Sequence, residues 1–235
     1  MIGVTYHSHA CFTISTENIK ILTDPFITGN PLAKIKPEDL NPDVILVSHG
    51  HPDHVGDTVE IAKANNSLVI APFELIVFLQ RQGVNPEKTH PMHIGGSYTF
   101  PWGSIKLTPA THGSAFVDDN NTIYTGNPCG FIISLEGKNI YFAGDTGITY
   151  EMKLIGEMYK IDLALLPIGG NFTMNVEDAV KACELLKAEV AIPMHYDTFD
   201  VIKKDPQEFV DLLERTHSYT KGVVVNFEET YILQW

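Results

Sequence analysis

Short apolar runs, rich in β-branched residues, recur along the chain and predict strands. Gly, Pro, Asn and Asp residues lie between many of these runs, where they favour turns. The predicted strands are Ile19–Thr23, Asp43–Ser48, Leu68–Ala71, Ile105–Ala110, Phe131–Leu135, Ile140–Ala143, Leu163–Pro167, Val190–Pro193 and Val223–Asn226.

Between the strands, apolar residues spaced three and four apart predict helices. Glu74–Gln82 and Val176–Lys187 each carry such a face. Asn175, followed three residues later by Asp178, resembles a capping box, and Asp205–Glu208 places a cap, a proline and an acidic residue in the order typical of a helix start. The pattern predicts an α/β chain in which helices cover sheets.

The chain contains an internal echo. The segment that ends at Asp24 resembles the segment that ends at Asp145, and Pro72 and Pro193 close equivalent apolar runs; both pairs are 121 residues apart. A duplicated half explains the echo, and so does the ordinary reuse of strand–helix units in α/β chains. If the half is duplicated, we expect two βα halves packed face to face, with both Asp-bearing loops at one edge.

Composition limits the class of protein. The 235 residues carry 16 Lys+Arg and 29 Asp+Glu, a net charge of −13, with 44% hydrophobic and 19% charged residues. These values are typical of one globular domain, here residues 1–235, and exclude a disordered chain. The acidic balance and the absence of a basic cluster disfavour nucleic acid and anionic membranes as partners. No membrane segment or signal peptide is recognisable, and three cysteines without a CxxC motif favour a cytoplasmic location.

Ten histidines stand out, and three of them lie in the segment Ser48–His54 directly after a predicted strand. That edge is where open α/β sheets place their sites. His49 and His51 alternate, so their imidazoles point the same way in an extended chain, and the turn at Gly50–Pro52 directs Asp53 and His54 toward a second ion. Imidazole and carboxylate ligands without thiolate suit Zn²⁺, Mn²⁺, Fe²⁺ or Ni²⁺ and argue against a closed structural zinc site.

The block His49-Gly-His51-Pro-Asp53-His54 resembles the HxHxDH motif of metallo-β-lactamase-fold hydrolases. The chain is most similar to a small branch related to L-ascorbate-6-phosphate lactonase, through Thr5-Tyr-His-Ser-His-Ala-Cys11, Leu22-Thr-Asp24-Pro-Phe26, Phe142-Ala-Gly-Asp145-Thr-Gly147 and Pro193-Met-His195-Tyr196. The resemblance implies a four-layer αβ/βα sandwich of two similar halves, which agrees with the echo.

The resemblance also implies a ligand set for two ions, with Zn²⁺ favoured. His49, His51 and His112 would bind the first ion, Asp53, His54 and His195 the second, and Asp145 would bridge them. Each of the three distant residues follows a predicted strand. The presence of Asp53 and His54 disfavours the redox chemistry of di-iron members of this fold, whose carboxylate pattern differs.

Several residues keep two interpretations. His9 either lies near the metals, as its counterpart in the resembling branch does, or caps the first hairpin. Asp24 either orients a ligand imidazole or caps a turn. The polar stretch 114–128 is either a lid or plain surface. Gly169–Thr173 either binds an anion at a helix start or forms a tight turn.

The function expected from these observations is a binuclear metal-dependent hydrolase. A metal-bridging hydroxide would attack a small ester, lactone or phosphodiester, with Asp53 orienting it or carrying a proton. Two divalent ions would make the site locally cationic although the protein as a whole is acidic, so the site would accept a small anionic substrate. A non-catalytic metal-binding or sensor protein is the main alternative, and a nuclease of the same fold is disfavoured by the charge. The sequence leaves the oligomeric state and the role of His7 open.

Overall fold

A computed structural model describes residues 1–234, which form two compact units. The first comprises residues 1–96, 113–128 and 226 onward, and the second comprises residues 97–112 and 129–225. The chain thus crosses between the units four times, and the candidate ligand His112 lies at one of these crossings.

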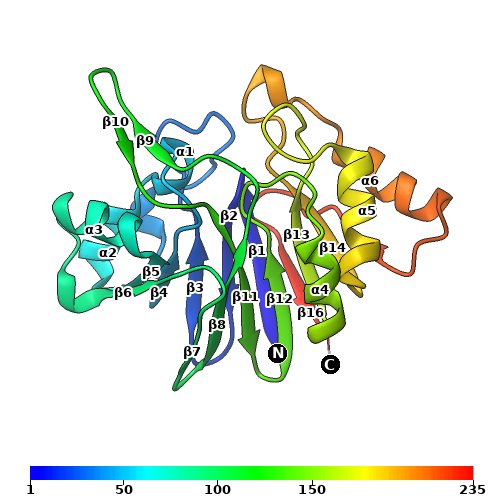
Figure 1. Cartoon of the computed structure of the whole chain (residues 1–235), viewed down its shortest axis with the longest axis horizontal. Helices are drawn as coiled ribbons and strands as arrows, with labels where there is room; N and C mark the ends of the chain where they lie inside the picture. The colour runs from blue at the N-terminus through cyan, green and yellow to red at the C-terminus, as the bar shows by residue number, and fades with distance from the viewer. Residues whose placement is uncertain (235) are drawn as a thin grey trace. The chain divides into compact units, whose positions relative to one another are not determined.

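The first unit contains a seven-stranded sheet in the order β16-β1-β2-β3-β4-β5-β6, drawn from blue to cyan for β1–β6 in Figure 1. Its first strands pair antiparallel, and β3 to β6 run parallel. Buried apolar residues of β3–β5, α2 and α3 form its hydrophobic core, because each strand of this parallel part turns an apolar face toward the helices. The elements are β1 Ile2–Ser8, β2 Cys11–Ser15, β3 Lys20–Thr23, β4 Val44–Leu46, α1 Pro52–Val55, α2 Thr58–Asn65, β5 Leu68–Pro72, α3 Phe73–Arg81, β6 Thr89–Met92, β16 Thr230–Leu233, the hairpin β9 Ala115–Val117 and β10 Thr122–Tyr124, and the 3₁₀ turns Pro37–Asp39 and Pro86–Lys88.

The second unit contains a seven-stranded sheet in the order β15-β14-β13-β12-β11-β8-β7. Strands β12 to β15 run parallel, and α5 packs against α4 and α6. Strand β13 is buried along its whole length, which explains why its sequence is a continuous apolar run. The elements are β7 Ser97–Phe100, β8 Gly103–Pro109, β11 Cys129–Leu135, β12 Lys138–Phe142, α4 Glu151–Met158, β13 Leu163–Pro167, α5 Val176–Leu186, β14 Val190–Met194, the 3₁₀ turn Asp200–Ile202, α6 Pro206–Arg215 and β15 Lys221–Gly222.

The two units repeat one hydrogen-bonding pattern, which favours duplication over chance reuse as the source of the echo. Strand order and direction agree from β2–β6 to β11–β15. Asp43 Oδ2 accepts a hydrogen bond from the backbone N–H of Lys20, and Asp162 Oδ2 accepts one from Asn139, both at 2.9 Å. In each unit this hydrogen bond links the beginning of one strand (β3 or β12) to the aspartate directly before the next parallel strand (β4 or β13).

The helix starts behave as their sequences predict. Asn175 caps α5 by accepting a hydrogen bond from the N–H of Asp178 at 2.8 Å, and Asp205 caps α6 by accepting one from Gln207 at 2.9 Å. Pro206 occupies the first turn of α6, where its missing N–H costs nothing.

The prediction of a strand at Val223–Asn226 is wrong. Strand β15 ends at Gly222, the Val223 N–H makes one more hydrogen bond to the Ala191 carbonyl of β14 at 2.9 Å, and the chain enters the other unit at Asn226. Val225 is buried, so this apolar run records burial rather than strand pairing. Strands β1 and β2 escape the sequence pattern because Thr, His and Ser interrupt their apolar positions. No helix among the described residues is long and apolar enough to cross a membrane.

Candidate metal centre

The first unit brings the HxHxDH side chains together at the end of β4. Strand β4 ends at Leu46, and α1 begins at Pro52 with His51 as its cap, so Asp53 and His54 lie in the first helical turn. The Nε2 atom of His49 lies 2.9 Å from Nδ1 of His51, and the ring centroids of His49 and His54 are 4.1 Å apart. The histidines therefore present their ring nitrogens within one small volume.

Asp24, directly after β3, holds two of these imidazoles in place. Its Oδ2 lies 2.8 Å from Nδ1 of His54 and accepts a hydrogen bond from Ser48 Oγ at 2.6 Å, while Oδ1 accepts one from the Ser48 N–H at 2.8 Å. Ser48 Oγ in turn lies 2.9 Å from Nδ1 of His49. One carboxylate thus positions His54 directly and His49 through a serine hydroxyl.

Burial raises the pKa of the Asp24 carboxyl, and hydrogen bonds from His54 and Ser48 oppose that shift. The residue is fully buried and its backbone is left-handed, with φ of 33°. Asp24 thus hydrogen-bonds the imidazole of the candidate ligand His54, and its carbonyl also accepts a hydrogen bond from the N–H of Phe26 in a turn. Ser48 is a residue that the sequence did not single out, because its role depends on Asp24 lying on the neighbouring strand.

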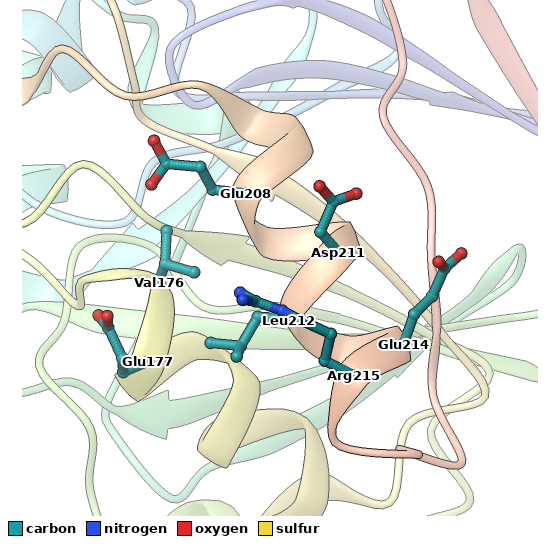
Figure 2. A pocket seen from close by; sticks show the side chains of 7 residues that line it. All are labelled: Val176, Glu177, Glu208, Asp211, Leu212, Glu214 and Arg215. Atoms are coloured by element: carbon teal, nitrogen blue, oxygen red, sulfur yellow. The ribbon is translucent and has the colours of Figure 1, made fainter.

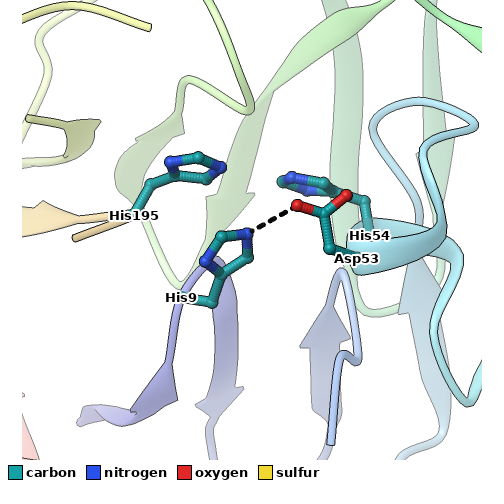
Figure 3. Close-up of side chains that lie close together, drawn as sticks. All are labelled: His9, Asp53, His54 and His195. Carbon is teal, nitrogen blue, oxygen red and sulfur yellow. Dashed lines mark hydrogen bonds and ion pairs between the residues drawn. The ribbon is translucent and has the colours of Figure 1, made fainter. Parts of the chain in front are cut away.

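His9 lies beside the same segment. Its ring is directed at the Asp53 carboxylate in Figure 3, with Nε2 3.2 Å from Oδ2, and it contacts Phe26 edge-on. His9 is buried and has a φ of 54°, a left-handed conformation that is uncommon for a residue with a side chain. His9 thus occupies the turn of the β1–β2 hairpin and also contacts the candidate ligand Asp53, so both interpretations of His9 stand.

The stretch 114–128 forms the β9–β10 hairpin, and its base is tied to the HxHxDH segment. The N–H of Gly50 donates a hydrogen bond to Ser114 Oγ at 3.2 Å, and Ser114 Oγ lies 2.8 Å from Thr125 Oγ1. A Cβ at Gly50 would lie 1.9 Å from Thr125 Oγ1, so only glycine fits there. Ser114 and Thr125 carry no sequence signal for this role.

The second unit gathers the other three predicted ligands. His112, Asp145 and His195 follow β8, β12 and β14. Asp145 Oδ2 lies 3.5 Å from Nε2 of His112 and 3.0 Å from Nε2 of His195. The carboxylate thus lies within reach of both imidazoles, and it is almost fully buried.

Backbone contacts fix the loops that carry these three side chains. The Gly147 N–H donates to the Thr111 carbonyl at 3.1 Å, and the Thr111 N–H donates to Thr146 Oγ1 at 2.9 Å. His195 itself has a φ of 57°. A left-handed residue costs free energy, and such residues cluster at functional sites.

The donor chemistry of both groups fits a divalent transition-metal ion. If Nδ1 of His54 donates to Asp24, Nε2 is the nitrogen that carries the lone pair, as a metal ligand requires. Imidazole and carboxylate groups are the ligands that zinc and neighbouring metals take in hydrolases. His49, His51, Asp53 and His54 of one unit and His112, Asp145 and His195 of the other all belong to these types.

The remaining histidines and one predicted turn lie outside these groups. His7 lies between Glu228 Oε2 and Thr13 Oγ1, both at 2.8 Å, and so ties β1 to β2 and to the C-terminal segment. Gly169–Thr173 is a turn. A hollow of about 710 Å³ between α5 and α6 of the second unit is lined by none of the candidate ligands (Figure 2). Four carboxylates and Arg215 dominate its walls.

Comparison with known proteins agrees with this chemistry. The family model described as "Beta-lactamase superfamily domain" matches residues 3–195. A UPF0173 metal-dependent hydrolase of Anoxybacillus flavithermus is 56% identical over 212 residues, covering 90% of this chain and 93% of the relative. A similar protein of Bacillus cereus is 56% identical over 213 residues, covering 90% and 92%.

Solved structures place the fold. Igni18, a metallo hydrolase from Ignicoccus hospitalis, is 38% identical with a TM-score of 0.88 and covers 98% of this chain and 97% of its own. These matches confirm the predicted mixed α/β fold, with two sheets flanked by helices. The chain therefore belongs to the UPF0173 family of metal-dependent hydrolases, within the superfamily of the metallo-β-lactamase fold.

Proposed function

We propose that the protein binds two divalent ions, Zn²⁺ foremost, and hydrolyses a small ester, lactone or phosphodiester. His49, His51 and His112 would hold the first ion, Asp53, His54 and His195 the second, and Asp145 both. Bound divalent ions supply Lewis acidity and lower the pKa of water so that it becomes a nucleophile near neutral pH.

The observation that carries the proposal is the Asp24–Ser48 network. Asp24 contacts Nδ1 of His54 directly, and it contacts Nδ1 of His49 through the Ser48 hydroxyl. Because Nδ1 of each ring is engaged in this way, Nε2 is directed outward as a ligand atom. A histidine cluster with a merely structural role has no need of one buried carboxylate that orients two rings at once.

Two side chains of the first unit have roles beyond ligation. Asp53 orients the nucleophilic water and carries a proton to the leaving oxygen of the substrate. His9, 3.2 Å from Asp53, holds the carboxylate of Asp53 in its rotamer. A lactone is kept among the proposed substrates only on the sequence resemblance of four segments to the branch related to ascorbate-6-phosphate lactonase. The charge of −13 argues against an RNA substrate and leaves room for a small anion.

The test compares His51→Ala with His217→Ala, a matched loss of an exposed histidine outside the candidate site. Elemental analysis should find fewer metal ions in His51→Ala and a wild-type content in His217→Ala. Hydrolysis of ester, lactone and phosphodiester panels should follow the metal content. Equal metal content in both variants would refute the ligand assignment. Metal binding without hydrolysis of any panel member would favour the metal-binding or sensor alternative, and tight RNA binding at low salt would favour a nuclease.

A further inference from the structure

The loops that carry candidate ligands in the second unit also expose large apolar side chains. Ile148 follows Asp145, Phe172 lies in the loop after β13, and Phe199 and Val201 follow His195. Phe172 is 54% exposed. Apolar residues scattered singly on a surface need no explanation, but a group of them beside a candidate site does.

These loops lie at one edge of the sheet. Strands β12, β13 and β14 are parallel neighbours, so their carboxyl ends meet there. The Met174 N–H donates to the Thr146 carbonyl at 2.9 Å, which joins the loop after β13 to the loop after β12. A Cβ at Gly169 would lie 2.4 Å from the carbonyl oxygen of His195, so the loop after β13 also lies against the loop after β14. The loops that expose these apolar side chains are therefore neighbours at one edge of the sheet, and together they are called the apolar rim.

The first unit, taken by itself, shows the same feature. Its β9–β10 hairpin exposes Val117, Ile123 and Tyr124, the last 67% exposed, and the base of that hairpin is hydrogen-bonded to Gly50 of the HxHxDH segment. In each unit, then, the segments next to candidate ligands present apolar surface to solvent.

We propose that the apolar rim of the second unit, formed by the loops after β12, β13 and β14, binds the acyl or aryl group of the substrate, so that the preferred substrate is an ester or lactone with an apolar substituent rather than a small, wholly polar one. The inference rests on the proposed function, because the rim borders the candidate ligands Asp145 and His195. A second copy of the chain fits less well, since the rim leads to a buried carboxylate. An anionic lipid surface is disfavoured by the net charge of −13.

The first experiment measures kcat/KM of the metal-loaded protein for p-nitrophenyl esters from acetate to octanoate. Full burial of one methylene corresponds to about a fourfold gain, so a partly open rim should give about twofold to fourfold per methylene. Phe172→Ser and Phe199→Ser, both in loops of the second unit, should each lower the octanoate-to-acetate ratio about tenfold. Tyr219→Ser is the matched control, because Tyr219 is 76% exposed and precedes β15, at the opposite edge of the sheet, so that this variant should keep the ratio.

A second measurement does not depend on hydrolysis. The metal-depleted protein is titrated with 8-anilinonaphthalene-1-sulfonate, an apolar aromatic anion, and the double variant Phe172→Ser/Phe199→Ser should bind it at least fivefold more weakly than Tyr219→Ser. Metal-dependent hydrolysis with no dependence on chain length would overturn the inference and leave the proposed function standing. Absence of metal-dependent hydrolysis would reject the proposed function, and unchanged dye binding in the double variant would then reject the inference separately. Light scattering that shows Phe172→Ser converting an oligomer to monomers would assign the rim to contacts between copies and overturn the inference.

Discussion

Replacement of Asp24 by asparagine tests the network that orients His49 and His54. Asn has nearly the shape of Asp, but it has one acceptor oxygen where the carboxylate has two. Oδ2 of Asp24 serves His54 and the Ser48 hydroxyl, while Oδ1 serves the Ser48 N–H. In any orientation, the new NH₂ group therefore faces a donor and leaves at least one buried donor unsatisfied.

The magnitude follows from these contacts. A hydrogen bond to a charged group contributes about 1.5–3 kcal/mol, and an unsatisfied buried donor costs about 1–3 kcal/mol. Burial raises the pKa of Asp24, so the neutral amide recovers part of the cost of burying a charge. The balance is a loss of about 2 kcal/mol in the free energy of unfolding of the metal-free protein. Loss of a carboxylate that orients a ligand histidine typically weakens metal binding about 10- to 100-fold.

The assay has two parts. Urea unfolding of metal-free Asp24→Asn gives the change in stability, and competition with a chelator gives the change in metal affinity. Asp119→Asn, an exposed carboxylate in the turn of the β9–β10 hairpin, is the matched control and should change neither. Wild-type metal affinity in Asp24→Asn would show that the network does not orient the ligands, whatever the change in stability.

Three further predictions concern the frame around the site. Burial would raise the pKa of Asp162, but the Asn139 N–H, Lys138 and Lys160 outweigh it and hold that pKa below its usual value. Because a lowered folded-state pKa contributes stability above the unfolded value and loses it as the pH falls, Asp162→Asn should lose about 2 kcal/mol at pH 7, and the difference from wild type should shrink in urea titrations below about pH 4. Gly50→Ala should destabilise the protein by about 2–3 kcal/mol in the same assay. Adding Thr125→Ala to this variant should recover part of the loss, because it removes the nearest clashing atom. If the effects of the two substitutions simply add, the clash is contradicted. The three free cysteines, Cys11, Cys129 and Cys183, are buried, and burial raises the thiol pKa of Cys11 and Cys183. Native protein should therefore not react with a thiol reagent at pH 8, whereas guanidinium should expose all three thiols. Rapid labelling of the native protein would refute this burial.

The local part of the site could be predicted from the sequence. The residues from His49 to His54 are close along the chain and follow an apolar run, so alternation at a strand end was enough to expect that they meet. The parallel strands and two helix caps were predictable for the same reason, since each depends on side chains a few residues apart. The Val223–Asn226 run was not, because burial by residues far along the chain gives the same apolar pattern as strand pairing.

The distant part of the site could not be predicted from local pattern. His112, Asp145 and His195 were assigned through resemblance, and their distances to one another follow from strand order in the second sheet. The partners of Asp24, and the contact of Gly50 with Thr125, likewise join residues that no periodicity connects. The types of the candidate ligands, the acidic charge and the repeated α/β pattern could be read from the sequence, because they depend on composition and on neighbouring residues. That one buried carboxylate orients two histidines, and that exposed apolar side chains lie on the loops that carry candidate ligands, became visible only in the folded chain, because such contacts arise when separate strands are packed into a sheet.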